Sequence, residues 1–257
     1  MNPPYKYMTP ASWVNNEINV FILGCGGSGS QFIDTIARLN YVIKKLGHKG
    51  LNVTVFDGDT VSEASVARQR FYPCDIGENK ALLTVHRLNL AYGMDWNAFP
   101  IMFIPSDYAP KPNSWGQSLP QALPDLIVSC VDKAKVRAEV SELGKYANDD
   151  ALFLDMGNGS SEGNVILGHW KQSERHDNSL VLPNVHSFYP ELSTMEDDDS
   201  PSCSMEESLR KQTLGINQTM ANTSCTLLWL LLREGGIDYQ GAFVDIKKGT
   251  SNPINIL

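Results

Sequence analysis

The stretch INVFILGCGGSGS, residues 18–30, joins a short β-branched run to a glycine-rich turn. Apolar side chains at helical spacing follow over residues 30–46, and LNVTVF at 51–56 has the pattern of a second strand. Strand, glycine turn, helix and strand in this order form a βαβ unit of an open parallel sheet. Glycines at such a turn let a phosphate chain approach backbone N–H groups at a helix N-terminus. The candidates for this contact are Gly24, Gly26, Gly27 and Gly29, and the alternative is a turn that serves helix–sheet packing alone.

The rest of the chain extends this pattern. We predict a Rossmann-like α/β fold, an open and mostly parallel sheet with helices on both faces and a long crossover loop. One domain would span residues 1–257, with a nucleotide-binding half at 1–160 and a second half at 161–257. The predicted helices are 78–91, 134–146 and 216–233; the further strands are 100–104, 125–131, 151–154, a strand after Gly157 and 241–249; the loop is 171–207.

Composition and charge exclude several classes of protein. A net charge of −8 gives the molecule no electrostatic reason to coat nucleic acid or anionic lipid. The longest apolar run, residues 227–232, is far shorter than the ~20 residues that span a bilayer. Five cysteines without any Cys-x-x-Cys pair argue against a disulfide framework and a structural zinc site. We therefore expect a cytoplasmic protein that binds neither nucleic acid nor membrane.

Charged residues after the second predicted strand distinguish two nucleotides. Asp57 ends this strand, where a carboxylate accepts hydrogen bonds from ribose hydroxyls, and this fits NAD and ATP equally. Arg68, Gln69 and Lys80 follow, and two cations there could stabilise charge that develops on a phosphate chain. A nicotinamide enzyme does not need these cations. The pattern favours ATP, with plain surface solvation as the alternative for any one cation.

Asp132 ends the predicted strand DLIVSCV, at the edge where open α/β sheets bind ligands. A carboxylate there can hold Mg²⁺ against a triphosphate. Aspartate is also a common helix N-cap, and a helix is predicted from residue 134. The sequence leaves these two roles open.

The ordered motifs resemble the adenylating ThiF/MoeB/HesA family, bacterial relatives of ubiquitin-activating enzymes. The resemblance covers about the first 160 residues, and the later half resembles the branch of the plasmid-associated PRTRC cassette. The first set is GCGGSGS (24–30), VTVFDGDTVSEASVARQRF (53–71), DIGENKA (75–81) and DLIVSCVD (125–132). The second is PSCSMEESLRKQTLGINQTMA (201–221), LLWLLL (227–232) and GAFVDIKKG (241–249), with KKLGHKGLNVTV (44–55).

The resemblance implies an activity. The chain would adenylate the C-terminal carboxylate of a small ubiquitin-like or sulfur-carrier protein with ATP and Mg²⁺, which releases pyrophosphate. The nucleotide would contact the four glycines, Asp57, Asp59, Ser65 and Gln69; Arg68 and Lys80 would act on the phosphates, and Asp132 would hold the metal.

Three departures from the family pattern motivate rival interpretations. Ser65 stands where the family usually has Asn, no Arg precedes Arg38, and the zinc-binding cysteine pairs of many relatives are missing. The chain could therefore be an inactive scaffold that only binds nucleotide or a partner. A nicotinamide oxidoreductase is a third interpretation, but it explains only the glycine turn and Asp57.

Two features of the second half bear on partners. Cys203 lies in the predicted crossover loop, where some relatives carry a nucleophilic cysteine, and it is either a nucleophile that forms a thioester or an incidental surface thiol. A conjugating-enzyme-like acceptor would then receive the activated protein. The apolar helix at 216–233 belongs either to the core or to a homodimer interface, as in the commonly dimeric relatives.

Overall fold

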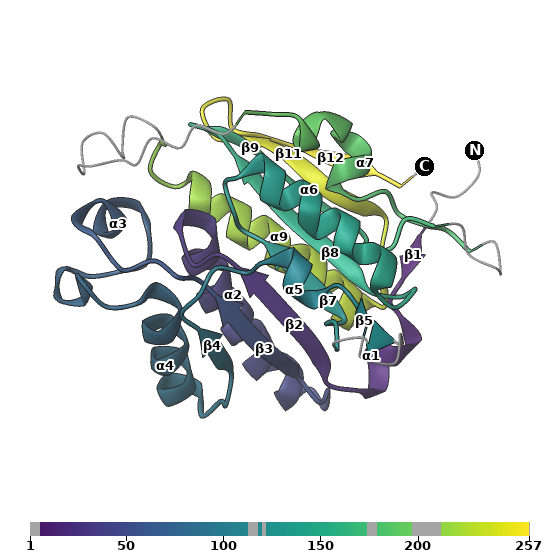
Figure 1. Cartoon of the computed structure of the whole chain (residues 1–257), viewed down its shortest axis with the longest axis horizontal. Coiled ribbons are helices and arrows are strands. Elements are labelled where there is room, and N and C mark those ends of the chain that lie inside the picture. The colour runs from purple at the N-terminus through teal and green to yellow at the C-terminus, as the bar shows by residue number, and fades with distance from the viewer. Residues whose placement is uncertain (1–5, 113–117, 120–121, 174–178, 197–211, 257) are drawn as a thin grey trace.

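A sheet with strand order β12-β11-β9-β8-β7-β2-β3-β4 crosses the whole computed structural model, which describes residues 6–112, 118–119, 122–173, 179–196 and 212–256 (Figure 1). Strands β2, β3, β4, β7 and β8 run parallel, and β9, β11 and β12 continue the sheet antiparallel. This confirms the predicted fold class. The strands are β2 Ile18–Leu23, β3 Leu51–Phe56, β4 Asn97–Phe99, β7 Leu126–Ser129, β8 Leu152–Asn158, β9 Glu162–His169, β11 Tyr239–Asp245 and β12 Thr250–Asn255.

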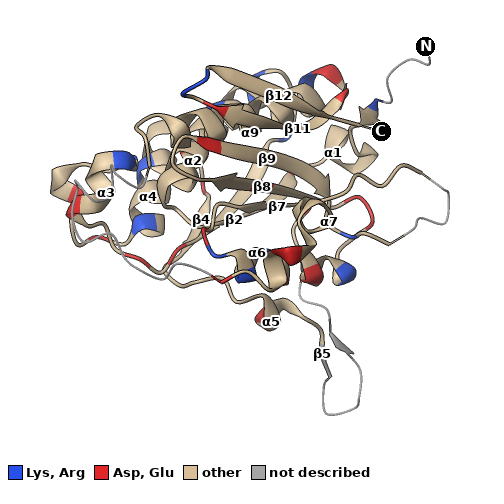
Figure 2. Ribbon diagram, turned by 90° about the horizontal axis from the view of Figure 1, so that it is seen from above, with Lys and Arg blue, Asp and Glu red and all other residues tan. Residues whose placement is uncertain are grey.

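Helices cover both faces of this sheet (Figures 1 and 2). One face carries α2 (Gly27–Lys45), α4 (Lys80–Tyr92) and α9 (Ile216–Glu234), and the other carries α5 (Pro105–Tyr108), α6 (Ala134–Leu143) and α7 (Val185–Phe188). Successive strand residues point to opposite faces, so Ile127 and Val128 of β7 are both fully buried in different hydrophobic clusters. Burial on two faces explains why the parallel strands have continuous apolar sequences.

The chain changes direction at β2. From β2 it passes to β3 and β4 on one side, and it returns to β7 and β8 on the other side. Open α/β sheets bind ligands at such a switch point, beyond the carboxyl ends of the strands. The glycine turn after Leu23 lies at this point, which is the position that the sequence predicts for a nucleotide.

Two predicted strands differ from the observed ones. The prediction of a strand at 100–104 is wrong: the strand is β4 at 97–99, and the following segment is irregular because Pro100 donates no hydrogen bond and Phe103 packs on Phe56 and Tyr108. The predicted strand 241–249 ends early. The chain turns near Gly249, with φ +65°, and returns as β12.

Short elements complete the described chain. The predicted loop at 171–207 is irregular over most of its described residues, but it contains α7 and the 3-10 turn η3. The remaining elements are β1 Tyr7–Met8, α1 Ala11–Asn15, α3 Glu63–Arg68, η1 Pro73–Asp75, β5 Lys111–Pro112, β6 Ser118–Leu119, η2 Gly144–Tyr146, η3 Pro190–Ser193 and β10 Gly236–Ile237.

Helix α9 is a core helix. Residues such as Met220, Leu227 and Leu231 are fully buried, and the helix packs on α2 and on the sheet. This matches the core interpretation of the apolar pattern, while the homodimer stays a prediction. Among the described residues, the helices all lack the combination of length and apolar sequence that a membrane span requires.

The motif DIGENKA is anchored by an ion pair that predicts acid sensitivity. The guanidinium of Arg87 lowers the pKa of Asp75 from 3.8 to about 2, and Asp75 also accepts from the Tyr72 N–H at 2.8 Å. Because the folded pKa lies below the unfolded value, this stabilisation is complete above about pH 4 and is lost as the pH falls toward about 2. We expect Asp75→Asn to lower stability at neutral pH by about 1–2 kcal/mol, after allowance for the half-exposed Arg87.

Thermal unfolding from about pH 6 to pH 2.5 measures this effect. The variant should lose less stability than the wild type on acidification, and Asp95→Asn, at an exposed carboxylate, should behave like the wild type. Parallel curves for wild type and Asp75→Asn would contradict the assignment.

Candidate functional site

The glycines of the turn have two different roles. Gly24 has φ +91°, and Cβ atoms on Gly24, Gly27 and Gly29 would lie 3.1, 2.7 and 2.1 Å from neighbouring atoms. A Cβ on Gly26, in contrast, would meet nothing within 4 Å. Three of the predicted glycines are therefore required by packing, and Gly26 borders open space at the N-terminus of α2. This space fits a phosphate, which the helix dipole attracts.

This division predicts opposite results for two alanine substitutions. Gly29→Ala should destabilise the protein by at least about 1–3 kcal/mol, because its Cβ would overlap the rigid Gly24 carbonyl. Gly26→Ala should leave the melting temperature nearly unchanged but weaken ATP binding about tenfold or more, equivalent to about 1.4 kcal/mol. Calorimetric melting and ATP titration of both variants test this. Normal ATP affinity in Gly26→Ala would mean that phosphate lies elsewhere.

Asp57, the residue after β3, binds the backbone of the glycine turn. Its carboxylate accepts from the N–H groups of Cys25 at 2.5 Å and of Asp59 at 2.8 Å. Burial raises the pKa of Asp57, and these hydrogen bonds oppose that effect. The side chain therefore organises the turn itself, in addition to its predicted place beside a ribose.

Lys80 lies at the first position of α4 and is almost completely buried. Its Nζ is 3.0 Å from Asp59 Oδ2, and its charge contributes to the electrostatic surroundings of Asp57 and Cys25. Asn79, the N-cap of α4, donates to the carbonyls of Asp57 and Asp59, both at 3.0 Å. The structure thus brings Asp57, Asp59 and Lys80 together beside the glycine turn.

Arg68 and Gln69 end helix α3 and carry buried polar atoms. Arg68 Nη1 donates to Gln212 Oε1 at 2.9 Å. Arg68 Nε and Gln69 Oε1 are buried and have no hydrogen-bond partner among the described residues. Burial lowers the pKa of Arg68, and the Asp132 carboxylate opposes this shift, so Arg68 and Asp132 share one electrostatic environment. Unsatisfied buried polar atoms are costly and indicate a ligand or ordered water.

Asp132 is exposed beyond the end of β7. The structure does not place Asp132 at the N-cap, since Lys133 is the N-cap residue of α6. The described residues contain no group of three or more His, Cys, Asp or Glu that could hold a metal ion. One exposed carboxylate nevertheless fits Mg²⁺ that takes its other ligands from water and phosphate oxygens.

Ser65 has a structural role in α3. It is buried and forms a capping box with Ser62, whose N–H donates to Ser65 Oγ at 3.1 Å. Its hydroxyl therefore stabilises the start of α3. The predicted contact of Ser65 with a nucleotide stays a prediction.

The cysteines of the described residues do not include an obvious nucleophile in the core. Burial raises the pKa of Cys25 to about 12 and that of Cys225 to about 11, and it raises the pKa of Cys130 well above its ordinary value. These thiols stay protonated at neutral pH. Cys74 is exposed. Cys203, the predicted nucleophile, lies outside the described residues.

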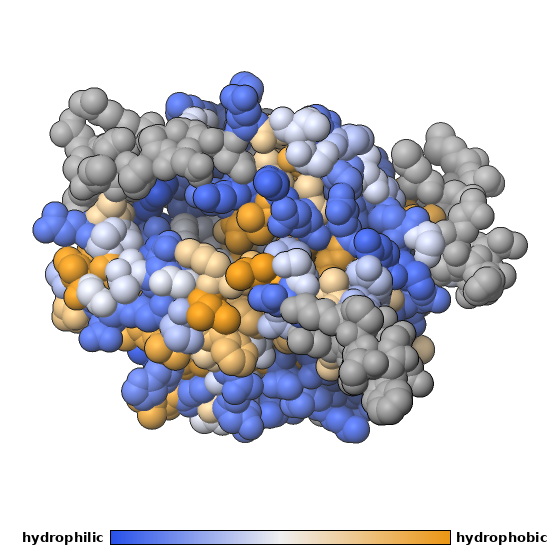
Figure 3. Space-filling model, in the orientation of Figure 1, coloured by the Kyte–Doolittle hydropathy of each residue, from blue (hydrophilic) through white to orange (hydrophobic). Residues whose placement is uncertain are grey.

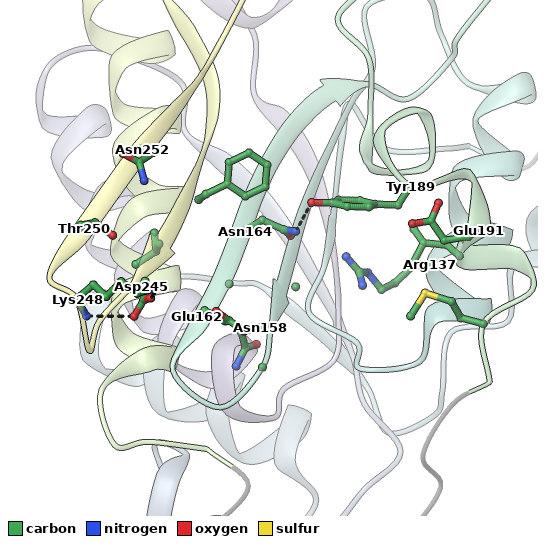
Figure 4. A pocket seen from close by; sticks show the side chains of 17 residues that line it. Arg137, Asn158, Glu162, Asn164, Tyr189, Glu191, Asp245, Lys248, Thr250 and Asn252 are labelled. Carbon is green, nitrogen blue, oxygen red and sulfur yellow. Dashed lines mark hydrogen bonds and ion pairs between the residues drawn. The ribbon is translucent and has the colours of Figure 1, made fainter.

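The structure has an open cavity of about 820 Å³ (Figure 4). It lies over the ends of β8, β9, β11 and β12, and Tyr189 and Glu191 line its opposite side. Asn164 donates to Tyr189 Oη at 3.2 Å, while the buried Asn164 Oδ1 has no partner among the described residues. Asn158, at the end of β8, lines the cavity and receives the hydroxyl of Ser28 in α2 at 3.1 Å. Cavity and glycine turn are thus neighbours.

A buried ion pair forms one wall of this cavity. Arg137 of α6 pairs with Asp155 of β8 through Nε at 2.9 Å and through Nη2. Asp155 is fully buried. A Cβ on Gly157 would lie 2.7 Å from Arg137 Nη2, so this glycine leaves room for the guanidinium. Sequence reasoning missed this pair, because residue spacing gives no sign that a strand aspartate meets a helix arginine.

An apolar segment lies beside Asp57 and Gly58. Ile101 and Met102 are more than half exposed, and a Cβ on Gly58 would lie 3.2 Å from the Met102 N atom. Phe99 stacks on Phe56 with ring centroids 5.3 Å apart, which fixes the start of this segment. Figure 3 shows hydrophobic side chains gathered on this face, in the region between β4 and α5. The segment was predicted as a strand, so its place at the site was missed.

Fold and site together define an α/β protein with a nucleotide-type glycine turn at the switch point of its sheet. The ThiF family matches residues 15–229, which is well over half of the chain. The chain belongs to the ThiF family, as the motifs predict. Among proteins with curated descriptions, none matches the chain significantly.

Solved structures agree in fold. PaaA is 15% identical with a TM-score of 0.59 over 93% of this chain and 64% of its own. E. coli MccB is 14% identical with a TM-score of 0.61 over 95% of this chain and 63% of its own. MccB is also known with ATP, at a TM-score of 0.53, and with MccA. The chain spans a little under two thirds of these structures.

Proposed function

We propose that this chain uses ATP to adenylate the C-terminal carboxylate of a small ubiquitin-like, β-grasp protein or sulfur carrier. The observation that carries the proposal is that a glycine turn, a carboxylate and two cations lie together at one edge of the sheet. Open space at Gly26, the anchored Asp57, the buried Lys80 and the partly unsatisfied Arg68 all lie at the carboxyl ends of the parallel strands. A dinucleotide site for hydride transfer requires the first two but not the two cations.

The reaction is an in-line displacement. A carboxylate oxygen of the carrier forms a bond to the α-phosphorus of ATP, the bond from that phosphorus to the bridging oxygen breaks, and pyrophosphate leaves with the electron pair. The products are an acyl-adenylate and pyrophosphate. Such a reaction needs alignment and charge neutralisation rather than a protein nucleophile. Lys80 and Arg68 would supply the positive charge that faces the phosphates.

The nucleotide would lie along the strand ends. Its phosphates would approach the N-terminus of α2 at Gly26, and its ribose would bind at Asp57. The exposed apolar side chains of Ile101 and Met102 would cover one face of the adenine ring. Asp59 and Gln69 complete the proposed contacts, because both lie next to these groups in the structure.

Mg²⁺ fits the carboxylate of Asp132, which is exposed and lies in the electrostatic environment of Arg68. When bound, the metal would neutralise charge on the phosphate oxygens. Asp132 would hold it on the side of the site formed by β7.

The cavity in Figure 4 suits the extended tail of a carrier protein. It is open, and it offers amide side chains such as Asn158, Asn164 and Asn252 that can hydrogen-bond to a peptide backbone. Because Asn158 contacts Ser28 at the glycine turn, a tail in the cavity would bring its carboxylate toward the phosphates.

A second step would move the activated carrier to Cys203. The thiolate would attack the acyl-adenylate, and AMP would leave. From there the carrier would pass to a conjugating-enzyme-like acceptor or to sulfur transfer. Mass spectrometry under non-reducing conditions tests this step. Cys203→Ser should keep pyrophosphate release and lose the thiol-sensitive adduct, whereas an adduct that persists in this variant would assign another nucleophile.

The inactive scaffold is the second candidate function. Ser65 supports it, since its hydroxyl serves the capping box of α3 and replaces the amide usual in the family. A nicotinamide oxidoreductase is disfavoured by the two cations. Isothermal titration with ATP and Mg²⁺ against NAD separates the classes. Binding of NAD alone would overturn the proposal.

The decisive test of the reaction uses a small carrier protein with a free C-terminal carboxylate. Incubation with ATP and Mg²⁺, followed by hydroxylamine, should convert the terminal carboxylate to a hydroxamate that mass spectrometry detects. A carrier with an amidated C-terminus is the matched control. ATP binding without hydroxamate for carriers encoded beside this gene would favour the scaffold.

A further inference from the structure

We propose that Gln212 and Asn217 are positioning residues that direct the guanidinium of Arg68 toward the phosphate site. This inference rests on the proposed adenylation, because it assigns a role within that reaction. It starts from a polar network that joins four separate segments of the chain: the glycine turn, the end of α3, the end of β8 and the start of α9.

Asn217 is the centre of this network. Its side-chain Oδ1 accepts from Ser28 Oγ at 3.1 Å and from Asn158 Nδ2 at 3.2 Å. Its Nδ2 donates to Gln212 Oε1 at 3.3 Å and to the Arg68 carbonyl at 3.5 Å. Both amide atoms of Asn217 are thus hydrogen-bonded, and Asn217 Oδ1 shares the single hydroxyl hydrogen of Ser28 with Asn158 Oδ1. Only this orientation of the amide satisfies the network, because the Arg68 carbonyl cannot donate.

The network is not a local feature of the helix. Asn217 is 5% exposed, and Gly215 rather than Asn217 is the N-cap residue of α9. Three of the four partners of Asn217 lie on other elements, up to 189 residues away in sequence. Gly27 is part of the arrangement, since a Cβ there would lie 2.7 Å from Asn217 Nδ2.

Gln212 connects the Asn217 network to the guanidinium of Arg68. Its Oε1 accepts from Asn217 Nδ2 and, at 2.9 Å, from Arg68 Nη1. The partner of the guanidinium is therefore a neutral amide. A carboxylate would bind Arg68 more tightly but would cancel its charge. The amide fixes the side chain and leaves its full positive charge, and Arg68 Nε stays without a partner among the described residues.

The first test measures the rate of adenylation and the affinity for ATP separately. Gln212→Ala and Asn217→Asp should each slow adenylation about 10- to 100-fold, since a misplaced catalytic group loses about this much. The dissociation constant of ATP should change less than about threefold. Asn217→Asp keeps the acceptor for Ser28 and removes the donors to Gln212 and Arg68. Asn222→Asp, at an exposed position of the same helix, is the matched control and should keep the full rate.

The second test asks whether Gln212 acts through Arg68. In an Arg68→Ala background, Gln212→Ala should cause no further loss of rate. An equal loss in both backgrounds would overturn the proposal, because Gln212 would then act elsewhere. Gln212→Glu should also be slow, because the carboxylate neutralises Arg68. A fully active Gln212→Glu would contradict the role of the neutral amide.

A third readout does not need catalysis. Phenylglyoxal modifies accessible guanidinium groups, and peptide mapping by mass spectrometry gives the rate at each arginine. Gln212→Ala should raise the modification rate of Arg68 about tenfold relative to the exposed Arg38, and Gln212→Glu should lower it. An unchanged rate in both variants would overturn the positioning role even if the wild type adenylates nothing. Absence of adenylation by the wild type, with the expected modification pattern, would overturn the proposed function alone.

Discussion

Asp132→Ala is expected to reduce adenylation by at least about 10³-fold and to leave the fold intact, because it removes the proposed metal anchor. The position of Asp132 in the structure supports the expectation that the fold stays intact. Asp132 is exposed and is not the N-cap residue of α6, so we expect its loss to cost less than the ~0.5–2 kcal/mol of a missing N-cap. Steady-state rates over a range of Mg²⁺ concentrations, together with thermal melting, measure both parts.

Two controls accompany this variant. Glu139→Ala removes an exposed carboxylate of α6, the helix that follows Asp132, and should keep full activity. Asp132→Asn keeps the shape of the side chain and should be as slow as the alanine variant. A folded Asp132→Ala protein with the wild-type rate and the wild-type Mg²⁺ dependence would remove Asp132 from the site.

Lys80→Met and Arg68→Ala should each lower the adenylation rate about 10²–10³-fold with a much smaller effect on ATP affinity. Both cations would stabilise the negative charge that moves onto the departing pyrophosphate. They would therefore stabilise the transition state more than they stabilise bound ATP. Methionine keeps the apolar stem of the buried Lys80, and it leaves Asp59 with solvent, since that carboxylate is about half exposed. Single-turnover rates and ATP titration separate the two effects.

Lys135→Ala, at an exposed position on α6, is the charge control and should have no effect. Equal losses of rate and of affinity would show that the cations only hold the nucleotide. Unchanged rates in both variants would support the inactive scaffold.

Much of the nucleotide half of the site could be predicted because its residues follow strands directly. The glycine turn, Asp57 and Asp132 each come shortly after the carboxyl end of a strand, and parallel strands bring these ends to one edge of the sheet. The motif around Lys80 predicts it as a site residue. The sequence does not predict its near-complete burial or its contact with Asp59, because both depend on how α4 packs against the loop after β3.

The residues that sequence reasoning missed are those that long-range packing brings together. Asn217 reaches Ser28 across 189 positions, and Arg137 meets Asp155 only because α6 packs on β8. No local spacing predicts such pairs. The predicted strand at 100–104 failed for a related reason: its apolar residues were assigned to the sheet, whereas Ile101 and Met102 are exposed beside Gly58.

The four glycines show that a motif does not tell which of its residues contacts a ligand. All four fit one motif, yet packing explains Gly24, Gly27 and Gly29, and only Gly26 borders open space. Ser65 similarly stands at a position where the family usually has Asn, and the structure gives its hydroxyl a capping role. A motif identifies which segment approaches a ligand, and contacts in the fold decide which atoms remain to bind it.

The most direct test of the central claim is ATP–pyrophosphate exchange by the wild-type protein in the presence of small carrier proteins encoded beside it. Exchange should require Mg²⁺ and the free C-terminal carboxylate of one carrier, and it should disappear when that carboxylate is amidated. Formation of an acyl-adenylate by reversible displacement predicts this dependence. A protein that binds ATP and Mg²⁺ but exchanges no label with any of these carriers, or exchanges it equally with the amidated carrier, would contradict the account.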